Sequence, residues 1–426
     1  MVLTKLVHVG LSGAFLMLPP SAAMRIADPG SLGTLLPYGS APATLEPVPA
    51  GYKPVFVESL NRHGSRALAT PANVDNALSL WRQASTAGAL TPLGQQFGAD
   101  AQKLLDANVR LGFGNLSSLG QDELRGIGSR TAARLPRLFG RGSSVDLVTS
   151  GVPRAIQSAK SFAKGLLSVA PGTDVNKPVT DTVQLQFDHT DPSYVGFLAD
   201  DRRTSQALRR IDGSPAAIGA ARHVLGRLYS PAFTKRIPDP LAAARAIYGV
   251  YAIAPGMAKE TSIRFDRYVP AVDASELAYI ADAHYFYESG PGIKGRADSF
   301  APAKVVLDDF FSAIDDRLAG GRTTAVFRFA HAEQLAPFAA LLQLPGSEKP
   351  AGPDADYAPG NNPWRGSEVA RLGSNVQWIV YSRSGSAPIV AVLDNEQSVS
   401  LGDSCRPIGS DSNLYELDEL KRCLPR

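Results

Sequence analysis

The chain has 426 residues, of which 44% are hydrophobic and 19% charged, a balance typical of one large or two medium globular domains with a sizeable core. This composition excludes wholesale disorder. The formal net charge of +3 is small and the basic residues are spread along the sequence, so we expect no nucleic-acid partner.

Residues 1–23 have the pattern of a secretory signal peptide. Lys5 precedes an apolar stretch from Leu6 to Leu18, and small residues lead up to a cleavage point after Ala23. We therefore expect a secreted or periplasmic protein. The apolar stretch is too short to span a bilayer, which leaves a buried N-terminal helix as the alternative. No later segment has a transmembrane pattern, and we expect no membrane partner.

Strands and helices alternate once the Pro- and Gly-rich lead-in of residues 24–51 has ended. Three short β-rich segments each precede a helical pattern. The pairs are 55–60 with a helix from about Ser65, 145–150 with 153–167, and 323–330 with 333–344. This alternation predicts an α/β fold with a mostly parallel sheet flanked by helices.

The pattern changes between residues 186 and 318, where helical segments are separated by Pro- and Gly-rich turns. We interpret this stretch as a smaller helical cap inserted into an α/β core formed by residues 24–185 and 319–426. The cap carries a local excess of basic residues, which suits a ligand with several phosphates, although each one alone is more simply a solvated residue. Beyond it, residues 375–395 predict a β-hairpin that turns at 382–386.

The two cysteines, Cys405 and Cys423, lie near the C-terminus. Two cysteines in an exported chain usually pair, so we predict a disulfide. In the chain-entropy model a loop of this length contributes roughly 3 kcal/mol to stability. Neither cysteine has a second cysteine or a histidine at ligand spacing, so we expect no metal there.

Polar side chains gather where three of the predicted strands end. Because ligands bind at the carboxyl edge of an open α/β sheet, next to helix N-termini, we expect these side chains to meet. Arginine forks match the oxygens of phosphate, so a phosphate or a similar oxyanion is the expected ligand. The residues are Arg62, His63 and Arg66 in "RHGSR", Arg154 in "SGVPRA", and His331 and Glu333 in "HAE".

The structural roles of several residues in and near these segments can be interpreted in more than one way. Gly64 would remove a side chain at the point of closest approach, and Arg66 would lie one helical turn from Arg62. Ser150 is a plausible cap of the helix that carries Arg154. Taken alone, His331 could be a core histidine and Glu333 a helix cap. His189 also follows a strand-like stretch, and a pocket role and a structural role are equally open for it.

Together, "RHGSR" and "HAE" resemble the histidine phosphatase superfamily, in its branch of histidine acid phosphatases and phytases. The "HAE" form, where many acid phosphatases have His-Asp, resembles the multiple inositol polyphosphate phosphatases. The resemblance covers nearly all of the mature chain, with further support from residues 120–139, 150–166, 286–293 and 405–424.

The resemblance implies a role for each site residue. His63 would be the nucleophile that becomes phosphohistidine, and Glu333 the proton donor. Arg62, Arg66 and Arg154 would hold the phosphate, together with a cationic His331. No cofactor and no metal are implied. Two departures from the family pattern are Leu68, where proline is frequent, and the absent His-Asp, which moves the acid one residue along.

These roles favour an exported, monomeric, metal-independent phosphomonoesterase that acts on inositol polyphosphates, chiefly myo-inositol hexakisphosphate (phytate). A broad-specificity acid phosphatase or a sugar phosphatase on the same scaffold is the close alternative. From a different class, the chain could be a polyanion-binding protein without activity. The joint presence of His63 and Glu333 argues against that reading, because binding alone would not require them.

Overall fold

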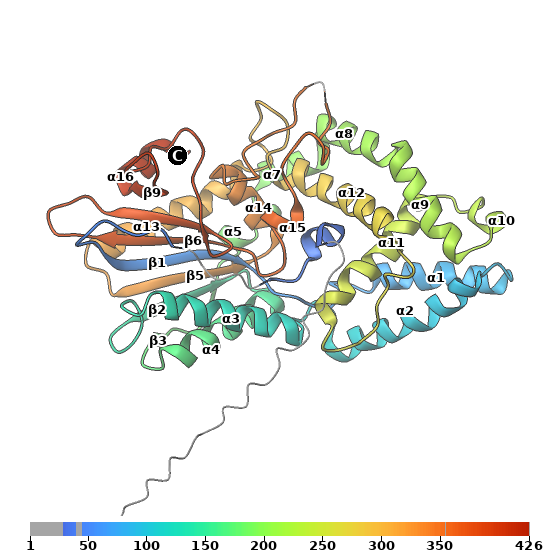
Figure 1. The fold of residues 1–426 in the computed structure, drawn as a ribbon, viewed down its shortest axis with the longest axis horizontal. Helices are drawn as coiled ribbons and strands as arrows, with labels where there is room; N and C mark the ends of the chain where they lie inside the picture. The colour runs from blue at the N-terminus through green and yellow to red at the C-terminus, as the bar shows by residue number, and fades with distance from the viewer. Residues whose placement is uncertain (1–28, 40–44, 354, 426) are drawn as a thin grey trace, which may run out of the picture.

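The computed structural model describes residues 29–39, 45–353 and 355–425. The predicted signal peptide, residues 1–23, lies outside the described residues. Figure 1 shows two parts, a β-sheet with helices on its faces and, beside it, a bundle of helices. The predicted α/β fold with a central sheet flanked by helices is confirmed.

Within the described residues, the sheet has nine strands in the order β3-β2-β5-β1-β6-β7-β8, with β4 paired to β2 and β9 paired to β7. β5 lies between β1 and β2 and is parallel to both, whereas β6 and β7 extend the sheet as the predicted antiparallel hairpin. The sheet is therefore mixed, and its parallel half carries the three predicted strand ends. The strands are β1 (Lys53–Arg62), β2 (Ser144–Thr149), β3 (Asp174–Val175), β4 (Val179–Thr180), β5 (Thr323–Ala330), β6 (Asn375–Ser382), β7 (Ile389–Asp394), β8 (Gln397–Ser398) and β9 (Leu414–Glu416).

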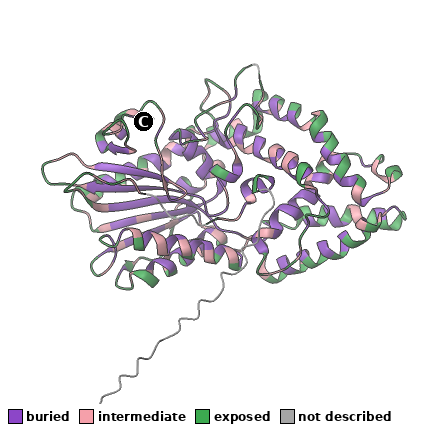
Figure 2. Cartoon of the chain, in the orientation of Figure 1, coloured by how far each residue is buried: buried purple, intermediate pink, exposed green. Residues whose placement is uncertain are grey.

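Helices bury both faces of the central strands, which explains why these strands are apolar along their length (Figure 2). On one face, the ring of Phe162 packs 4.5 Å from that of Phe327, between centroids. On the other face, Phe310 lies 5.4 Å from Trp378. The helices that cover the two faces are α3 (Ser118–Arg134) and α4 (Pro153–Val169) on the first, and α13 (Lys304–Leu318) and α14 (Ala332–Leu341) on the second.

The bundle combines helices from the predicted cap with two helices from outside it. The segment 72–111 contributes α1 and α2, which pack against α11 and α9. The cap boundaries at residues 186 and 318 stay a prediction. Among the described helices, none is both long and apolar enough to cross a membrane. The bundle consists of α1 (Ala72–Thr86), α2 (Pro92–Leu111), α7 (Pro192–Asp200), α8 (Arg202–Asp212), α9 (Pro215–Leu228), α10 (Pro231–Thr234), α11 (Pro240–Ile253) and α12 (Ala271–Ser289).

Short polar caps fix where the bundle helices begin. Ser214 accepts a hydrogen bond from the backbone N–H of Ala217 at the start of α9, and Asp239 accepts one from Ala242 at the start of α11. Both helices have proline at their first position, where a missing N–H costs nothing. The shorter helices are α5 (Thr182–Leu185), α6 (Phe187–Thr190), α15 (Gly366–Val369) and α16 (Leu417–Cys423), with 3-10 turns at Pro29–Leu35, Ala254–Met257 and Ala301–Ala303.

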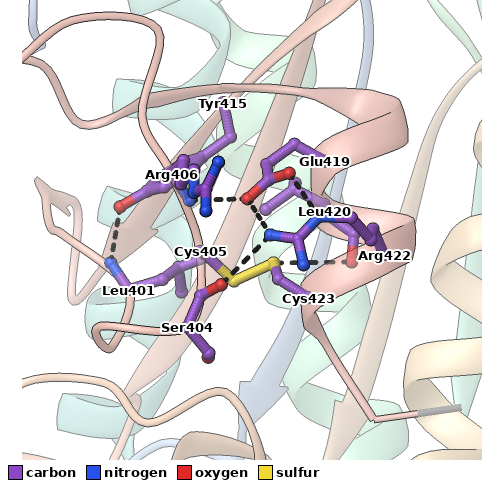
Figure 3. The surroundings of a disulfide bond; sticks show 9 residues. All are labelled: Leu401, Ser404, Cys405, Arg406, Tyr415, Glu419, Leu420, Arg422 and Cys423. Carbon is purple, nitrogen blue, oxygen red and sulfur yellow. Dashed lines mark hydrogen bonds and ion pairs between the residues drawn. A yellow bond between two sulfur atoms is a disulfide. The ribbon is translucent and has the colours of Figure 1, made fainter.

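The predicted disulfide between Cys405 and Cys423 is present and ties a loop to α16 at the C-terminal end of the chain (Figure 3). Polar contacts reinforce the same junction, because the Glu419 carboxylate accepts from the backbone N–H of Arg406 at 2.7 Å and pairs with Arg422. β9 joins this junction to the sheet through β7. The C-terminal segment is thus attached to the far edge of the sheet.

Candidate active site

The three predicted strand ends lie side by side at one edge of the sheet. Arg62, the last residue of β1, is the register partner of Ala330, the last residue of β5. Beyond it, the backbone N–H of His63 donates to the Ala330 carbonyl at 3.0 Å. On the other side of β5, the N–H of Ser150 donates to the Phe329 carbonyl at 3.1 Å. The prediction that these segments meet is confirmed.

The loop after β1 is not the predicted helix from about Ser65, because α1 begins only at Ala72. The backbone of this loop bonds to distant residues instead of to itself. Ser65 donates its N–H and its hydroxyl to the Glu123 carboxylate at 2.7 and 2.8 Å, and Ala67 donates to the Asn115 carbonyl. The expectation that Arg66 lies one helical turn from Arg62 is therefore wrong.

Gly64 lies at the closest approach between this loop and α3, as predicted. A Cβ built on Gly64 would lie 2.7 Å from the Gly120 carbonyl oxygen and 2.5 Å from Leu124 Cδ2. Both distances are shorter than van der Waals contact, so only glycine fits without a shift. The backbone contact holds His63 at a fixed place.

His63 is 2% exposed and its ring has a defined hydrogen bond. Nδ1 lies 2.9 Å from the Gly64 carbonyl oxygen, which can only accept, so Nδ1 carries the proton and Nε2 keeps its lone pair. Burial, reinforced by Arg62 and Arg66, lowers the pKa of His63 well below its usual range. The imidazole is therefore neutral, and its free nitrogen can attack an electrophile.

Three guanidinium groups surround His63, in agreement with the predicted cluster. Arg62 donates through Nη1 to the carbonyl oxygens of Thr34 and Ala370, and Arg66 donates to that of Ala67. The buried Nε atoms of Arg62, Arg66 and Arg154 have no partner among the described residues. Burial and the neighbouring guanidinium groups lower the pKa of Arg66 to about 10. Like charges with unused donors form a site for an anion.

His331 lies next to His63, with 5.4 Å between the ring centroids. Its Nε2 is 2.9 Å from the Ser150 hydroxyl, so Ser150 orients this ring rather than capping α4, whose N-cap is Val152. Arg154 does lie in the first turn of α4, as predicted. Burial and Arg154 lower the pKa of His331 to about 3, so a cationic His331 requires the opposing charge of a bound anion.

Glu333 lies in the first turn of α14 and faces the same cluster. Its Oε1 accepts a hydrogen bond of 3.2 Å from the Tyr285 hydroxyl. Burial alone would raise the pKa of Glu333, but Arg62 and the other donors around it hold the pKa below its usual range. All six predicted residues are thus brought together at one place.

Sequence reasoning missed three polar side chains that support this cluster. Glu123 holds the loop after β1, Tyr285 contacts Glu333, and the partly buried Asp188 accepts from Gln334, the neighbour of Glu333, at 2.6 Å. Glu123 lies in a segment that the family resemblance had singled out, but nothing in the sequence marks the other two. His189, for which a pocket role was open, is exposed and pairs with Asp188.

In the part of the chain that the structure describes, no group of three or more His, Cys, Asp or Glu side chains is arranged to hold a metal ion. Several basic residues of the predicted cap are already paired. Arg210 bonds to Asp356, and Arg267 to Asp100. None of the basic cap residues is assigned to the site.

Comparisons with known proteins point to one family. Residues 55–199 match the family described as Histidine phosphatase superfamily (branch 2). A structure of the Bifidobacterium longum multiple inositol polyphosphate phosphatase in complex with inositol hexasulfate is similar at a TM-score of 0.86 and 28% identity, over 93% of this chain and 97% of that one. The complex of the same protein with phosphate has a TM-score of 0.85 and 28% identity, over 92% and 97%.

A phytase from D. castellii has a TM-score of 0.65 at 12% identity, over 92% of this chain and 84% of that one, which shows a shared fold. No curated protein sequence matches the chain.

Proposed function

We propose that this chain, a phosphoric monoester hydrolase whose residues 55–199 match the histidine phosphatase superfamily (branch 2), removes phosphate from inositol polyphosphates, with phytate as its chief substrate. One observation carries the proposal. Three arginines with unused buried donors surround a neutral histidine whose Nε2 is free to attack. The relative of known structure that was solved with inositol hexasulfate, a polyanion of the same ring, supports this substrate class.

In the first step, His63 Nε2 attacks phosphorus and the bond to the ester oxygen breaks. Arg62, Arg66 and Arg154 bind the phosphoryl oxygens and stabilise the charge that moves onto them. The fixed Nδ1 hydrogen bond to Gly64 keeps the lone pair of Nε2 directed at the site. The product of this step is a phosphohistidine and an alkoxide that needs a proton.

Glu333 supplies that proton. Arginines keep it ionised in the structure, but a phosphate dianion bound to the same arginines offsets their charge and raises the pKa of the carboxyl group. Substrate binding thus provides the protonated acid where the alkoxide forms. In the second step, the Glu333 carboxylate takes a proton from water, which attacks the phosphohistidine and releases inorganic phosphate and free His63.

The remaining parts of the proposal are export, metal independence and a monomeric state. Export depends on residues 1–23, and N-terminal sequencing of the mature protein tests it directly, with cleavage after Ala23 as the expected result. Activity on phytate should survive EDTA. Complete loss that added metal restores would instead identify a metallophosphatase. Size-exclusion chromatography with light scattering measures the oligomeric state.

The decisive experiment is a time course of phytate hydrolysis with the inositol phosphate products resolved by isomer, next to glucose 1-phosphate as a competing substrate. Successive lower inositol phosphates with slow release from glucose 1-phosphate support the proposal. The reverse order of rates identifies the sugar or broad acid phosphatase. Stable phytate binding without phosphate release over hours identifies the polyanion-binding alternative.

His63→Ala tests the nucleophile, and His223→Gln is a matched control. His223 lies on α9 in the bundle, is largely exposed, and bonds to Asp273, which a glutamine can still reach. We expect His63→Ala to abolish hydrolysis of every phosphomonoester, because no covalent intermediate can form. His223→Gln should keep normal rates. Residual turnover by His63→Ala with a phosphoenzyme still detectable would place the nucleophile elsewhere.

A further inference from the structure

A tyrosine from the helical bundle reaches the proposed acid. Tyr285 lies on α12, and its hydroxyl is 3.2 Å from Glu333 Oε1. Among the described residues, it is the one side chain that donates a hydrogen bond to this carboxylate. We propose that Tyr285 is a positioning residue that occupies Glu333 Oε1, so that the proton given to the leaving group is carried by Oε2. This inference rests on the proposed function of Glu333.

The argument begins with how many protons the two groups have. A protonated carboxyl group has one proton for two oxygens, and a tyrosine hydroxyl has one proton to donate. The adjacent Glu333 charge, reinforced by burial, raises the pKa of Tyr285, so its hydroxyl keeps its proton. When this hydroxyl donates to Oε1, the acid proton is on Oε2. The leaving alkoxide then takes its proton from one defined oxygen, and the attacking water later returns a proton to the same atom.

The charged surroundings make such a selection necessary. Ionisable groups from several elements interact electrostatically with Glu333, so without a fixed partner the proton could reside on either oxygen. These groups come from β1, the loop after it, α4, α6, α7, α12 and the N-cap of α14, and they are Arg62, Arg66, Arg154, Asp188, Tyr194, Tyr285 and His331. Of these, only Tyr285 is both neutral and bonded directly to the carboxylate.

A second consequence concerns the pKa of Glu333. A hydrogen bond donated to a carboxylate stabilises its ionised form and lowers its pKa. Removal of the Tyr285 hydroxyl should therefore raise this pKa. Because a general acid works only while it is protonated, activity falls as pH rises through the pKa of the acid in the enzyme–substrate complex. The loss of the hydroxyl should move the alkaline limb of the kcat profile to higher pH.

Tyr285→Phe removes the hydroxyl and keeps the ring, and Tyr279→Phe is a matched control. Tyr279 lies on the same helix, and its hydroxyl donates to the Tyr357 carbonyl at 2.8 Å, away from Glu333. For Tyr285→Phe we expect kcat on phytate to fall roughly tenfold at the pH optimum of the wild-type enzyme. We also expect the alkaline limb of the kcat profile to move to higher pH by about one unit, the usual effect of one hydrogen bond to a charged group. Tyr279→Phe should leave both unchanged.

Two further measurements keep the outcomes distinct. In a Glu333→Gln background, Tyr285→Phe should have no additional effect, because the proton that it positions is absent. An unchanged pH profile in an active Tyr285→Phe enzyme, or a change in KM alone, would overturn the inference and leave the proposed function intact. Failure of the wild-type protein to hydrolyse any phosphomonoester would refute the proposed function instead. Thermal unfolding of both tyrosine variants checks that each is folded.

Discussion

Replacing Gly64 by alanine adds a single methyl group at the tightest backbone contact of the candidate site. The new Cβ would lie 2.7 Å from the Gly120 carbonyl oxygen, and a displacement of about 0.7 Å is needed to restore an ordinary contact of 3.4 Å. Leu124 can yield by rotating its side chain. The carbonyl of Gly120 cannot, because α3 holds it and because a Cβ on Gly120 would itself meet the Ser65 carbonyl oxygen at 2.0 Å.

The loop must therefore move, and His63 moves with it. Overpacking of this kind costs about 1–3 kcal/mol of unfolding free energy. A shift approaching 1 Å at a reacting group costs on the order of hundredfold in rate. We expect Gly64→Ala to lower kcat on both phytate and para-nitrophenyl phosphate by about that factor, because the nucleophile serves both substrates.

Gly219→Ala is the matched control, because nothing lies within 4 Å of the new Cβ and Gly219 is in helix α9. This variant should keep full activity and gain up to about 1 kcal/mol in stability, since alanine favours helix. Urea unfolding and steady-state kinetics measure both quantities. A Gly64→Ala enzyme with wild-type kcat and stability would show that the loop is compliant and would refute the claim that this contact fixes His63.

Three further predictions address the remaining groups. Glu333→Gln should lower kcat on phytate, whose alkoxide needs a proton, by about hundredfold, but kcat on para-nitrophenyl phosphate, whose phenolate leaves unaided, by clearly less. Equal losses on both substrates would remove Glu333 from the acid role. Glu348→Gln, at an exposed position, is the control. Arg154→Lys keeps the charge but loses the planar fork, so turnover should fall strongly, while the exposed control Arg137→Lys should be neutral. Cys405→Ser should lower stability by roughly 3 kcal/mol and spare kcat, and a free thiol in the unreduced wild-type protein would contradict the disulfide.

The sequence was most informative where the chemistry follows from strand order. Arg62, His63, His331 and Glu333 lie at or just beyond the ends of strands that run parallel, and parallel strands end at the same edge of a sheet. Their meeting could be predicted without knowledge of which strands are neighbours. The hairpin of β6 and β7 was equally predictable, because its turn residues and its apolar strands are adjacent in sequence.

Contacts between segments that are distant in sequence could not be predicted in this way. The loop after β1 has a helical pattern in isolation, but Glu123 and Asn115 take its hydrogen bonds and exclude the helix. Likewise, Ser150 bonds to His331 instead of capping α4. Tyr285 lies in a segment whose spacing predicts only a helix, and its contact with Glu333 depends on how the bundle packs on the sheet.

The position of β5 has a consequence for how the chain reaches its native state. β5 completes the sheet between β1 and β2, yet it follows them in sequence only after helices α4 to α13. Val57 must therefore pair with Ala325, far along the chain. Pairings at such separation form slowly, because a long loop must close before any contact is gained. During synthesis, the edges of β1 and β2 that pair with β5 remain without their backbone partner until residue 330 has been made. Truncated or stalled chains that end before this point should aggregate rather than accumulate as soluble, inactive protein.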